Sequence, residues 1–165
     1  HYILWATSVS GVGAVKVMPL WRGNGTVKVI VVDAEKEMPS EELLKVVRTK
    51  IAENAPIGAT VTVSAPSLVQ IDISMKVTKG DGNADAIKKV LNSYFKENVF
   101  QTDYANIENL NQKTTVSLAQ VGKIILENEA QTGVKDYSNL TLNQGTDNII
   151  VNADGMPCVG TVTLT

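Results

Sequence analysis

The sequence predicts an α+β fold made of two small α/β sandwich modules, each a mainly antiparallel sheet covered by helices. Helical and strand-like hydrophobic periods succeed each other along the 165 residues. Hydrophobic residues make up 44% of the chain, which is enough to bury a core in one domain or two small ones. Pro66 interrupts an alternating strand pattern. We therefore place the modules at residues 1–65 and 66–165.

The first module is expected to contain a β-hairpin, a helix and a strand. Residues 12–19 and 26–32 are rich in β-branched side chains, and the Gly-bearing segment 22–25 between them is typical of a hairpin turn. A helix should begin after Ser40, a good N-cap, and end before Pro56. Residues 60–65 then alternate as a half-buried strand does. The apolar stripe of the helix is predicted to consist of Leu43, Leu44, Val47 and Ile51.

The second module is expected to contain a strand, two helices and a C-terminal β-meander. Alternation from Val69 to Val77 predicts the strand, and a second helix follows the turn at residues 79–82. Ser117 and Gln120 have the spacing of a capping box, so a third helix should run from there to about Gly133. Residues 134–142, 148–151 and 159–164 predict the meander. The stripe of the second helix is formed by Ile87, Val90, Leu91, Tyr94 and Phe95.

The start of the chain indicates a fragment of a longer protein. The first residue is His1 rather than Met, and the amphipathic stretch 2–6 follows it directly. The order of a helix, a Gly-Val pair, a strand and a Gly-Thr-Val segment near the N-terminus is repeated near the C-terminus. This echo favours two related sandwiches, the first of which lacks an N-terminal strand.

Composition narrows the classes of partner. Lys and Arg total 15 against 17 Asp and Glu, a formal charge of -2, so no positive field would attract a nucleic acid. No apolar run approaches the roughly 20 residues that span a bilayer, so no membrane insertion is expected. Cys158 has no second cysteine to pair with, and its strand-like setting predicts a buried structural thiol.

Three patterns that could carry chemistry each have a structural interpretation. Gly11 and Gly13 begin like a dinucleotide fingerprint, but Lys16 occupies the third glycine position and a strand should follow. Asp81, Asn83 and Asp85 have calcium-loop spacing without the required glycine and closing glutamate, which favours turn and helix-cap roles. A single histidine and scattered carboxylates offer no triad and no acid pair. We predict no catalytic, cofactor-binding or metal-binding residues and no cofactor.

The candidate interaction residues lie in two segments. Trp21 falls in the predicted hairpin turn, where a large aromatic residue either packs within the molecule, the more frequent role, or anchors an interface. Residues 107–116 form a polar segment rich in Asn and Gln, of a kind that is often ordered by a partner. The candidate interface residues are Trp21, Arg22, Asn24, Asn109, Asn111 and Gln112.

Three blocks of packing and turn residues span nearly the whole chain. The first comprises WA (5–6), SGVG (10–13), PLW (19–21) and GNGTV (23–27), the second PIGA (56–59), VTV (61–63) and AP (65–66), and the third GVKDYSNLTL (133–142). In this order they resemble the baseplate J-like family of contractile phage tails and related injection machines. Members of that family are about twice as long, so the resemblance identifies this chain as a C-terminal half.

The resemblance implies a structural, non-enzymatic assembly protein of a phage or prophage baseplate. Such a wedge protein joins other baseplate and tail proteins, or further copies of itself, around the tail hub and helps couple baseplate rearrangement to sheath contraction. It would be assembled in the bacterial cytoplasm and reside in the tail baseplate of the virion. Two alternatives stay open, a cell-surface or glycan-binding module that uses Trp21 and a cell-wall hydrolase of the tail.

Overall fold

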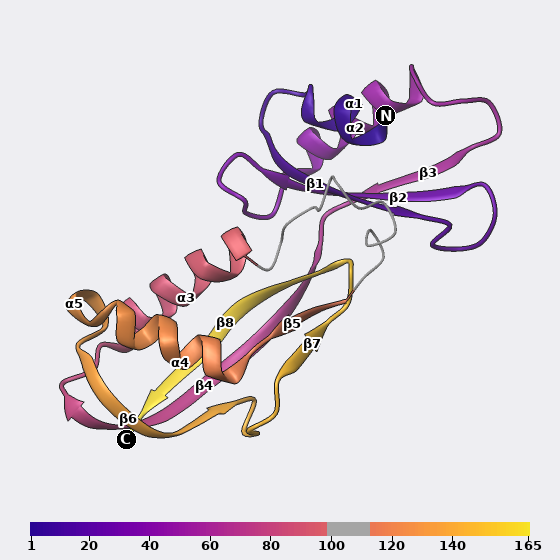
Figure 1. The fold of residues 1–165 in the computed structure, drawn as a ribbon. Helices are drawn as coiled ribbons and strands as arrows, with labels where there is room; N and C mark the ends of the chain where they lie inside the picture. Colours follow the sequence, from indigo (N-terminus) through magenta and orange to yellow (C-terminus); the bar gives the residue numbers. More distant parts are fainter. Residues whose placement is uncertain (99–112) are drawn as a thin grey trace. The chain divides into compact units, whose positions relative to one another are not determined.

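The computed structural model describes residues 1–98 and 113–165 (Figure 1). They fall into two compact units, an N-terminal unit of residues 1–67 and a C-terminal unit of residues 68–98 and 113–165. Each unit combines small β-sheets of two or three strands with helices, so the predicted α+β class is confirmed.

The N-terminal unit contains a three-stranded sheet and two helices. Its elements are α1 (Tyr2–Thr7), β1 (Val12–Pro19), β2 (Thr26–Asp33), α2 (Glu41–Ala52) and β3 (Thr60–Ser64). The strands lie in the order β1-β2-β3, with β1 antiparallel to β2 and β3 parallel to it. The parallel pair follows from the crossover through α2, which returns the chain to the end of the sheet where β2 began.

Helix α2 forms where its local signals predicted. The Ser40 side chain accepts a hydrogen bond from the backbone N–H of Leu43 at 3.1 Å, which satisfies one of the free donors of the first turn. Leu44, Val47 and Ile51 are buried, whereas Leu43 is half-buried. The core beneath the helices consists of Ala6, Val15, Val17, Val29, Val31, Leu44, Val47, Ile51 and Val63.

The central strand β2 is buried on both of its faces. Val29 and Val31 belong to the core under α2, while Ile30 and Val32 point to the opposite face and are also 0% exposed. The sequence carries this signal as the nearly unbroken apolar run of residues 29–32, which is typical of a strand covered on both sides. A half-buried strand would have shown a polar residue at every second position.

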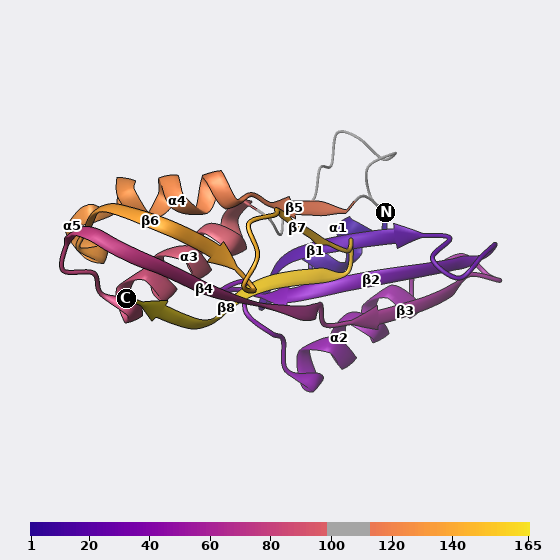
Figure 2. The same cartoon turned by 90° about the horizontal axis from the view of Figure 1, so that it is seen from below.

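The C-terminal unit contains five strands and three helices among its described residues. They are β4 (Ser67–Gly80), α3 (Ala84–Asn98), β5 (Thr114–Val116), α4 (Leu118–Glu127), α5 (Glu129–Thr132), β6 (Val134–Leu142), β7 (Ile149–Val151) and β8 (Gly155–Leu164). One sheet has the order β6-β4-β8, and β5 pairs with β7 in a second. Helix α3 packs against β8 and α4 against β6 (Figure 2).

The three-stranded sheet of this unit is mixed. β6 runs antiparallel to β4. On the other side, the backbone of Thr165 accepts from the N–H of Val77 at 3.2 Å and donates to the carbonyl of Met75 at 3.1 Å. Thr165 thus bonds to both neighbours of Lys76, which is the hydrogen-bond pattern of parallel strands. Figure 1 shows β4 and β8 running in the same direction.

The predicted C-terminal meander is therefore wrong. β6 and β8 both pair with β4 rather than with their neighbours in sequence, and β7 pairs with β5. β4 takes the centre because its 14 residues place Ile71, Ile73 and Met75 on one buried face. Hydrogen-bonding partners on both sides of β4 satisfy the backbone of this long strand.

Two further boundaries differ from the prediction. The third helix is broken at Asn128, whose φ of -102° and ψ of 34° are not helical and whose side-chain Nδ2 donates to the Ile124 carbonyl at 2.8 Å. The last three residues of the segment 107–116, expected to be loop, form β5. β5 pairs with a strand more than thirty residues later in the chain, so no local pattern announces it.

Candidate interaction surfaces

The segment with calcium-loop spacing is used to begin a helix. The Asn83 side-chain oxygen accepts from the N–H of Ala86 at 3.1 Å, as an N-cap does. The backbone N–H groups of Asp81 and Asn83 donate to the carbonyls of Gly133 and Thr132, at 3.1 and 2.7 Å. Within the ranges 1–98 and 113–165, no three His, Cys, Asp or Glu residues gather in a way that could hold a metal ion.

The two glycines that begin like a dinucleotide fingerprint lie at the start of β1. The antiparallel pairing of β1 with β2 shifts register between Val12 and Ala14, and Gly13 lies at this bulge. A Cβ added at Gly13 would collide with the backbone carbonyl of Asp33. Gly13 is therefore required for close strand approach, and a strand follows it where a nucleotide site needs a helix.

The turn between β1 and β2 is tightly hydrogen-bonded. The N–H of Leu20 donates to the Thr26 carbonyl at 2.7 Å, and the N–H of Gly23 donates to the Leu20 carbonyl at 3.0 Å. The Thr26 hydroxyl donates to the Gly23 carbonyl at 2.7 Å and accepts from the N–H of Arg22 at 3.1 Å. This network fixes the backbone that presents the predicted residues Trp21, Arg22 and Asn24.

Trp21 packs against two cations rather than in the core. It is half-buried and belongs to neither hydrophobic core of the described residues. The Arg22 guanidinium carbon lies 4.2 Å from the centroid of the Trp21 ring, and the Lys28 ammonium lies 4.9 Å from it. Both distances are those of cation–π contacts, so the ring is held in place while Arg22 stays exposed.

A second loop lies beside this turn. The N–H of Thr60 donates to the Gly25 carbonyl at 2.8 Å, and a Cβ added at Gly25 would lie 3.6 Å from the carbonyl oxygen of Gly58. The turn that precedes β3 thus ends at the same edge as the hairpin, and it carries the fully exposed side chain of Ile57. We call Leu20, Trp21, Arg22, Lys28 and Ile57 the hairpin-end surface.

A shallow groove continues from the hairpin-end surface. It has a volume of about 410 Å³ and runs between the C-terminal part of α2 and β3, with Ile57 among its lining residues. Polar and apolar atoms contribute about equally to its walls, and Arg48 is the charged residue that lines it. The Arg48 guanidinium is bonded to Glu41 at 2.5 Å and to the carbonyl of Val63 at 3.3 Å. The groove therefore combines apolar and polar walls with a cation that is paired with Glu41.

The other predicted interface residues lie outside the hairpin-end surface. Asn24 is exposed at the tip of the hairpin turn. Asn109, Asn111 and Gln112 lie outside the described residues. Sequence reasoning missed Leu20, Lys28 and Ile57. The one signal for Ile57 was an isolated large apolar residue in the turn sequence PIGA.

Cys158 differs from the predicted buried thiol. It lies on β8 and is only partly buried. Desolvation by this partial burial raises the pKa of the Cys158 thiol, while the nearby Lys88 ammonium opposes the shift. A raised pKa lowers the fraction of the thiol that is present as the reactive thiolate. This favours a packing role for Cys158.

A larger groove lies in the C-terminal unit between α3 and the helices α4 and α5. It has a volume of about 650 Å³, and apolar groups from Val90, Tyr94 and Ile124 form part of its wall. Val90 and Tyr94 belong to the predicted stripe of α3, but they are only half-buried. The stripe of α3 therefore serves the core with Ile87, Leu91 and Phe95 and lines this groove with its two other members.

Comparison with protein families gives two adjacent matches. Residues 1–65 match the baseplate J-like central domain, and residues 69–165 match the baseplate J-like protein C-terminal domain.

None of the helices in the described part of the chain is long and apolar enough to cross a bilayer.

Two relatives from Bacillus subtilis (strain 168) match almost the whole chain. The uncharacterized protein YqbT is 31% identical over 99% of this chain, and the phage-like element PBSX protein XkdT is 32% identical over 98% of it. The chain spans about half the length of these relatives, 47% and 46%. Among solved structures, a chain of the anti-feeding prophage baseplate has a TM-score of 0.57 at 11% identity, covering 94% of this chain and 35% of that one. At this identity the likeness concerns the fold.

Proposed function

Because the chain belongs to the baseplate J-like family, we propose that it is a structural part of the baseplate of a contractile phage tail or of a related prophage particle. It acts through protein–protein contacts around the tail hub. Its partners are other baseplate and tail proteins and further copies of itself, and it neither binds nucleic acid nor catalyses a reaction. It is assembled in the bacterial cytoplasm and resides in the tail baseplate.

The observation that carries this proposal is the order of the two family matches. The central and C-terminal domains follow each other over residues 1–65 and 69–165, as in one continuous protein, and leave only three residues between them. The name of the relative XkdT, a protein of the phage-like element PBSX, supports a phage-derived origin for the group. The fold shared with a chain of the anti-feeding prophage baseplate agrees with the same setting.

The surface chemistry favours contact with proteins. The hairpin-end surface joins exposed apolar side chains to the exposed Arg22 and the half-buried Lys28, a mixture that suits protein interfaces, where aromatic residues and Arg are enriched. For glycan binding, Trp21 would need an open ring face for a sugar to stack on. The Arg22 and Lys28 cations lie 4.2 and 4.9 Å from the centroid of that ring and leave less of it open to a sugar.

Light scattering after size-exclusion chromatography tests the proposed role. The full-length protein is mixed with the tail proteins encoded beside its gene, and the mass of every eluting species is determined. The proposal predicts a complex of defined stoichiometry that survives the column. If the full-length protein elutes alone at monomer mass with every neighbour tested, the structural role is wrong.

A further inference from the structure

We propose that the hairpin-end surface and the groove beside it dock an acidic segment of another baseplate protein, one that carries an aliphatic or aromatic side chain among its Asp and Glu residues. This inference rests on the proposed function and names the chemistry of one partner contact. It adds Leu20, Lys28, Ile57 and the α2–β3 groove to the residues that the sequence suggested.

The apolar part of the surface is unusually exposed. Leu20 is 61% exposed and Ile57 is fully exposed, and they project from two turns that are hydrogen-bonded side by side. A single exposed aliphatic residue is ordinary, but two beside a half-buried Trp and a partly apolar groove are consistent with an interaction site. The 410 Å³ groove offers a place for one apolar side chain of the partner.

Backbone strain at the turn supports a functional role. Leu20 has a φ of 57°, in the left-handed region that a branched apolar residue rarely adopts. Gly or Asn would adopt this conformation at lower cost. The turn network between Leu20, Gly23 and Thr26 holds Leu20 in this conformation with its side chain exposed.

The charges that flank the Trp21 ring are positive. From residue 12 to residue 32 the chain contains Lys16, Arg22 and Lys28 and no Asp or Glu. Arg22 and Lys28 are oriented by the Trp21 ring, so their charges are fixed before a partner arrives. The Arg48 cation that lines the groove is paired with Glu41 and is not counted among these charges. A partner segment that carries carboxylates complements this arrangement, while a basic one is repelled.

The opposite end of the N-terminal unit is acidic. A second copy of this chain is therefore the alternative partner for the hairpin-end surface. β2 runs from Thr26 at the hairpin end to Asp33, and the following residues to the first turn of α2 include Glu35, Glu37, Glu41 and Glu42 with a single Lys36. A second copy of this chain therefore presents an acidic segment too. The proposed partner is another baseplate protein, and photo-crosslinking distinguishes it from a second copy of this chain.

Site-specific photo-crosslinking in the assembled complex tests the proposal. The full-length protein carries Ile57→p-benzoylphenylalanine, is mixed with its neighbouring tail proteins and is irradiated, and the adducts are sequenced by mass spectrometry. Val46→p-benzoylphenylalanine is the control, because Val46 is an exposed apolar residue on α2 that lines neither the surface nor its groove. We expect an adduct at position 57 to a segment of another protein that combines Asp or Glu with an apolar residue.

Charge reversal provides the second arm. Arg22→Glu with Lys28→Glu should weaken assembly at least ten-fold at low salt, whereas Lys45→Glu with Lys50→Glu, the same charge change on the exposed face of α2, should leave it within two-fold. Ala52→Trp fills the groove from an exposed helix position without changing charge and should also weaken assembly. Circular dichroism melts confirm that each variant is folded.

The outcomes separate this inference from the proposed function. An adduct to a second copy, to a basic or uncharged segment, or no adduct at position 57 overturns the inference while assembly itself still forms. Equal effects of the Arg22/Lys28 and Lys45/Lys50 reversals overturn it as well. If no assembly forms with any neighbour, the proposed function fails and the inference fails with it.

Discussion

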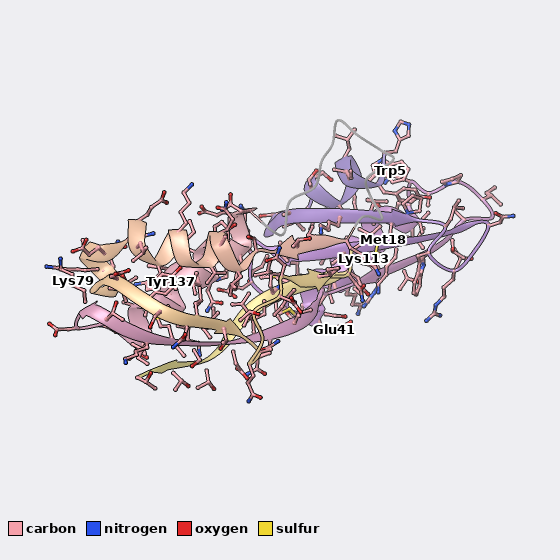
Figure 3. The ribbon with its side chains drawn as sticks, turned by 60° about the horizontal axis from the view of Figure 1, so that its bottom comes forward. Trp5, Met18, Glu41, Lys79, Lys113 and Tyr137 are labelled. Atoms are coloured by element: carbon pink, nitrogen blue, oxygen red, sulfur yellow. The ribbon has the colours of Figure 1, made fainter. Side chains whose placement is uncertain are left out.

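Tyr137 sets how closely α4 approaches β6. The residue lies on β6 beside α4 (Figure 3). A Cβ added at Gly122 of α4 would collide with the Tyr137 hydroxyl and ring. Leu140 also lies within van der Waals distance of that position. Gly122 therefore occupies a helical position where a side chain would force the Tyr137 ring to move or the helix to shift from the sheet.

Gly122→Ala should lower the free energy of unfolding of the C-terminal unit by about 1–2 kcal/mol. Overpacking costs about 1–3 kcal/mol, and the better helix propensity of Ala returns up to about 1 kcal/mol. Urea denaturation measures the change. In a Tyr137→Leu background the same substitution should cost much less, because the shorter side chain leaves room. An equal cost in both backgrounds would show that the contact is not the cause.

Cys158 should react slowly with thiol reagents. Its raised pKa lowers the thiolate fraction at neutral pH, and only the thiolate reacts. The second-order rate with DTNB at pH 7.5 is therefore expected to fall below that of a free cysteine model and to rise with pH. Lys88→Gln should slow the reaction further, since the Lys88 charge lowers this pKa. Faster reaction of the Lys88→Gln protein would contradict the assignment.

At the scale of elements, Asn143 extends the pairing of β6 with β4. Its N–H donates to the Asp72 carbonyl at 2.8 Å, and its side-chain oxygen accepts from the N–H of Asp72 at 2.7 Å. Its φ of 49° turns the main chain away from the sheet directly after β6. The side chain thus supplies the acceptor that the departing backbone no longer offers.

Two substitutions separate the side-chain hydrogen bond of Asn143 from its left-handed backbone conformation. Asn143→Gly keeps the left-handed backbone and loses the side-chain acceptor, so it should destabilise the C-terminal unit by about 1–2 kcal/mol. Asn143→Ala adds backbone strain and should cost about 1 kcal/mol more. Chemical denaturation of the two variants side by side gives the difference. If Asn143→Gly is as stable as the unchanged protein, the Asn143 side chain does not stabilise the C-terminal unit.

The elements differ in how far the sequence predicts them. α2 was predictable because Ser40, the apolar stripe and Pro56 are all local to the helix. The pairing of β8 with β4 was not, because its partners lie more than eighty residues apart and no turn specifies the pair. In the candidate surface, Trp21 and Arg22 stood out by residue type in a hairpin turn. The exposure of Leu20 and Ile57 depends on two loops that meet only in the folded unit.

At the scale of the whole molecule, we propose that residues 1–65 and 66–165 are separate cooperative modules. The hydrophobic cores of the described residues support this, since one lies in the N-terminal unit and the other in the C-terminal unit. Each core would then unfold with its own free energy.

Val47→Ala and Leu91→Ala test the modular proposal. Each removes a fully buried side chain from one core and should cost that module about 2–4 kcal/mol. Native-state hydrogen exchange should show faster exchange of amides in the mutated module and little change in the other. Equal acceleration in both modules by either substitution would mean that the chain unfolds as one unit.

The family assignment gives these modules a place in a larger assembly. The chain spans about half the length of its curated relatives. We propose that the hairpin-end surface takes part in that assembly.

Immunogold electron microscopy of purified tail particles tests the baseplate role most directly. Antibodies raised against this chain are applied to particles from the source bacterium, after mass spectrometry has established which proteins those particles contain. The account predicts that the protein is present and that gold marks the baseplate end of the tail. Absence of the protein from intact particles, or labelling confined to the head or sheath, would contradict it.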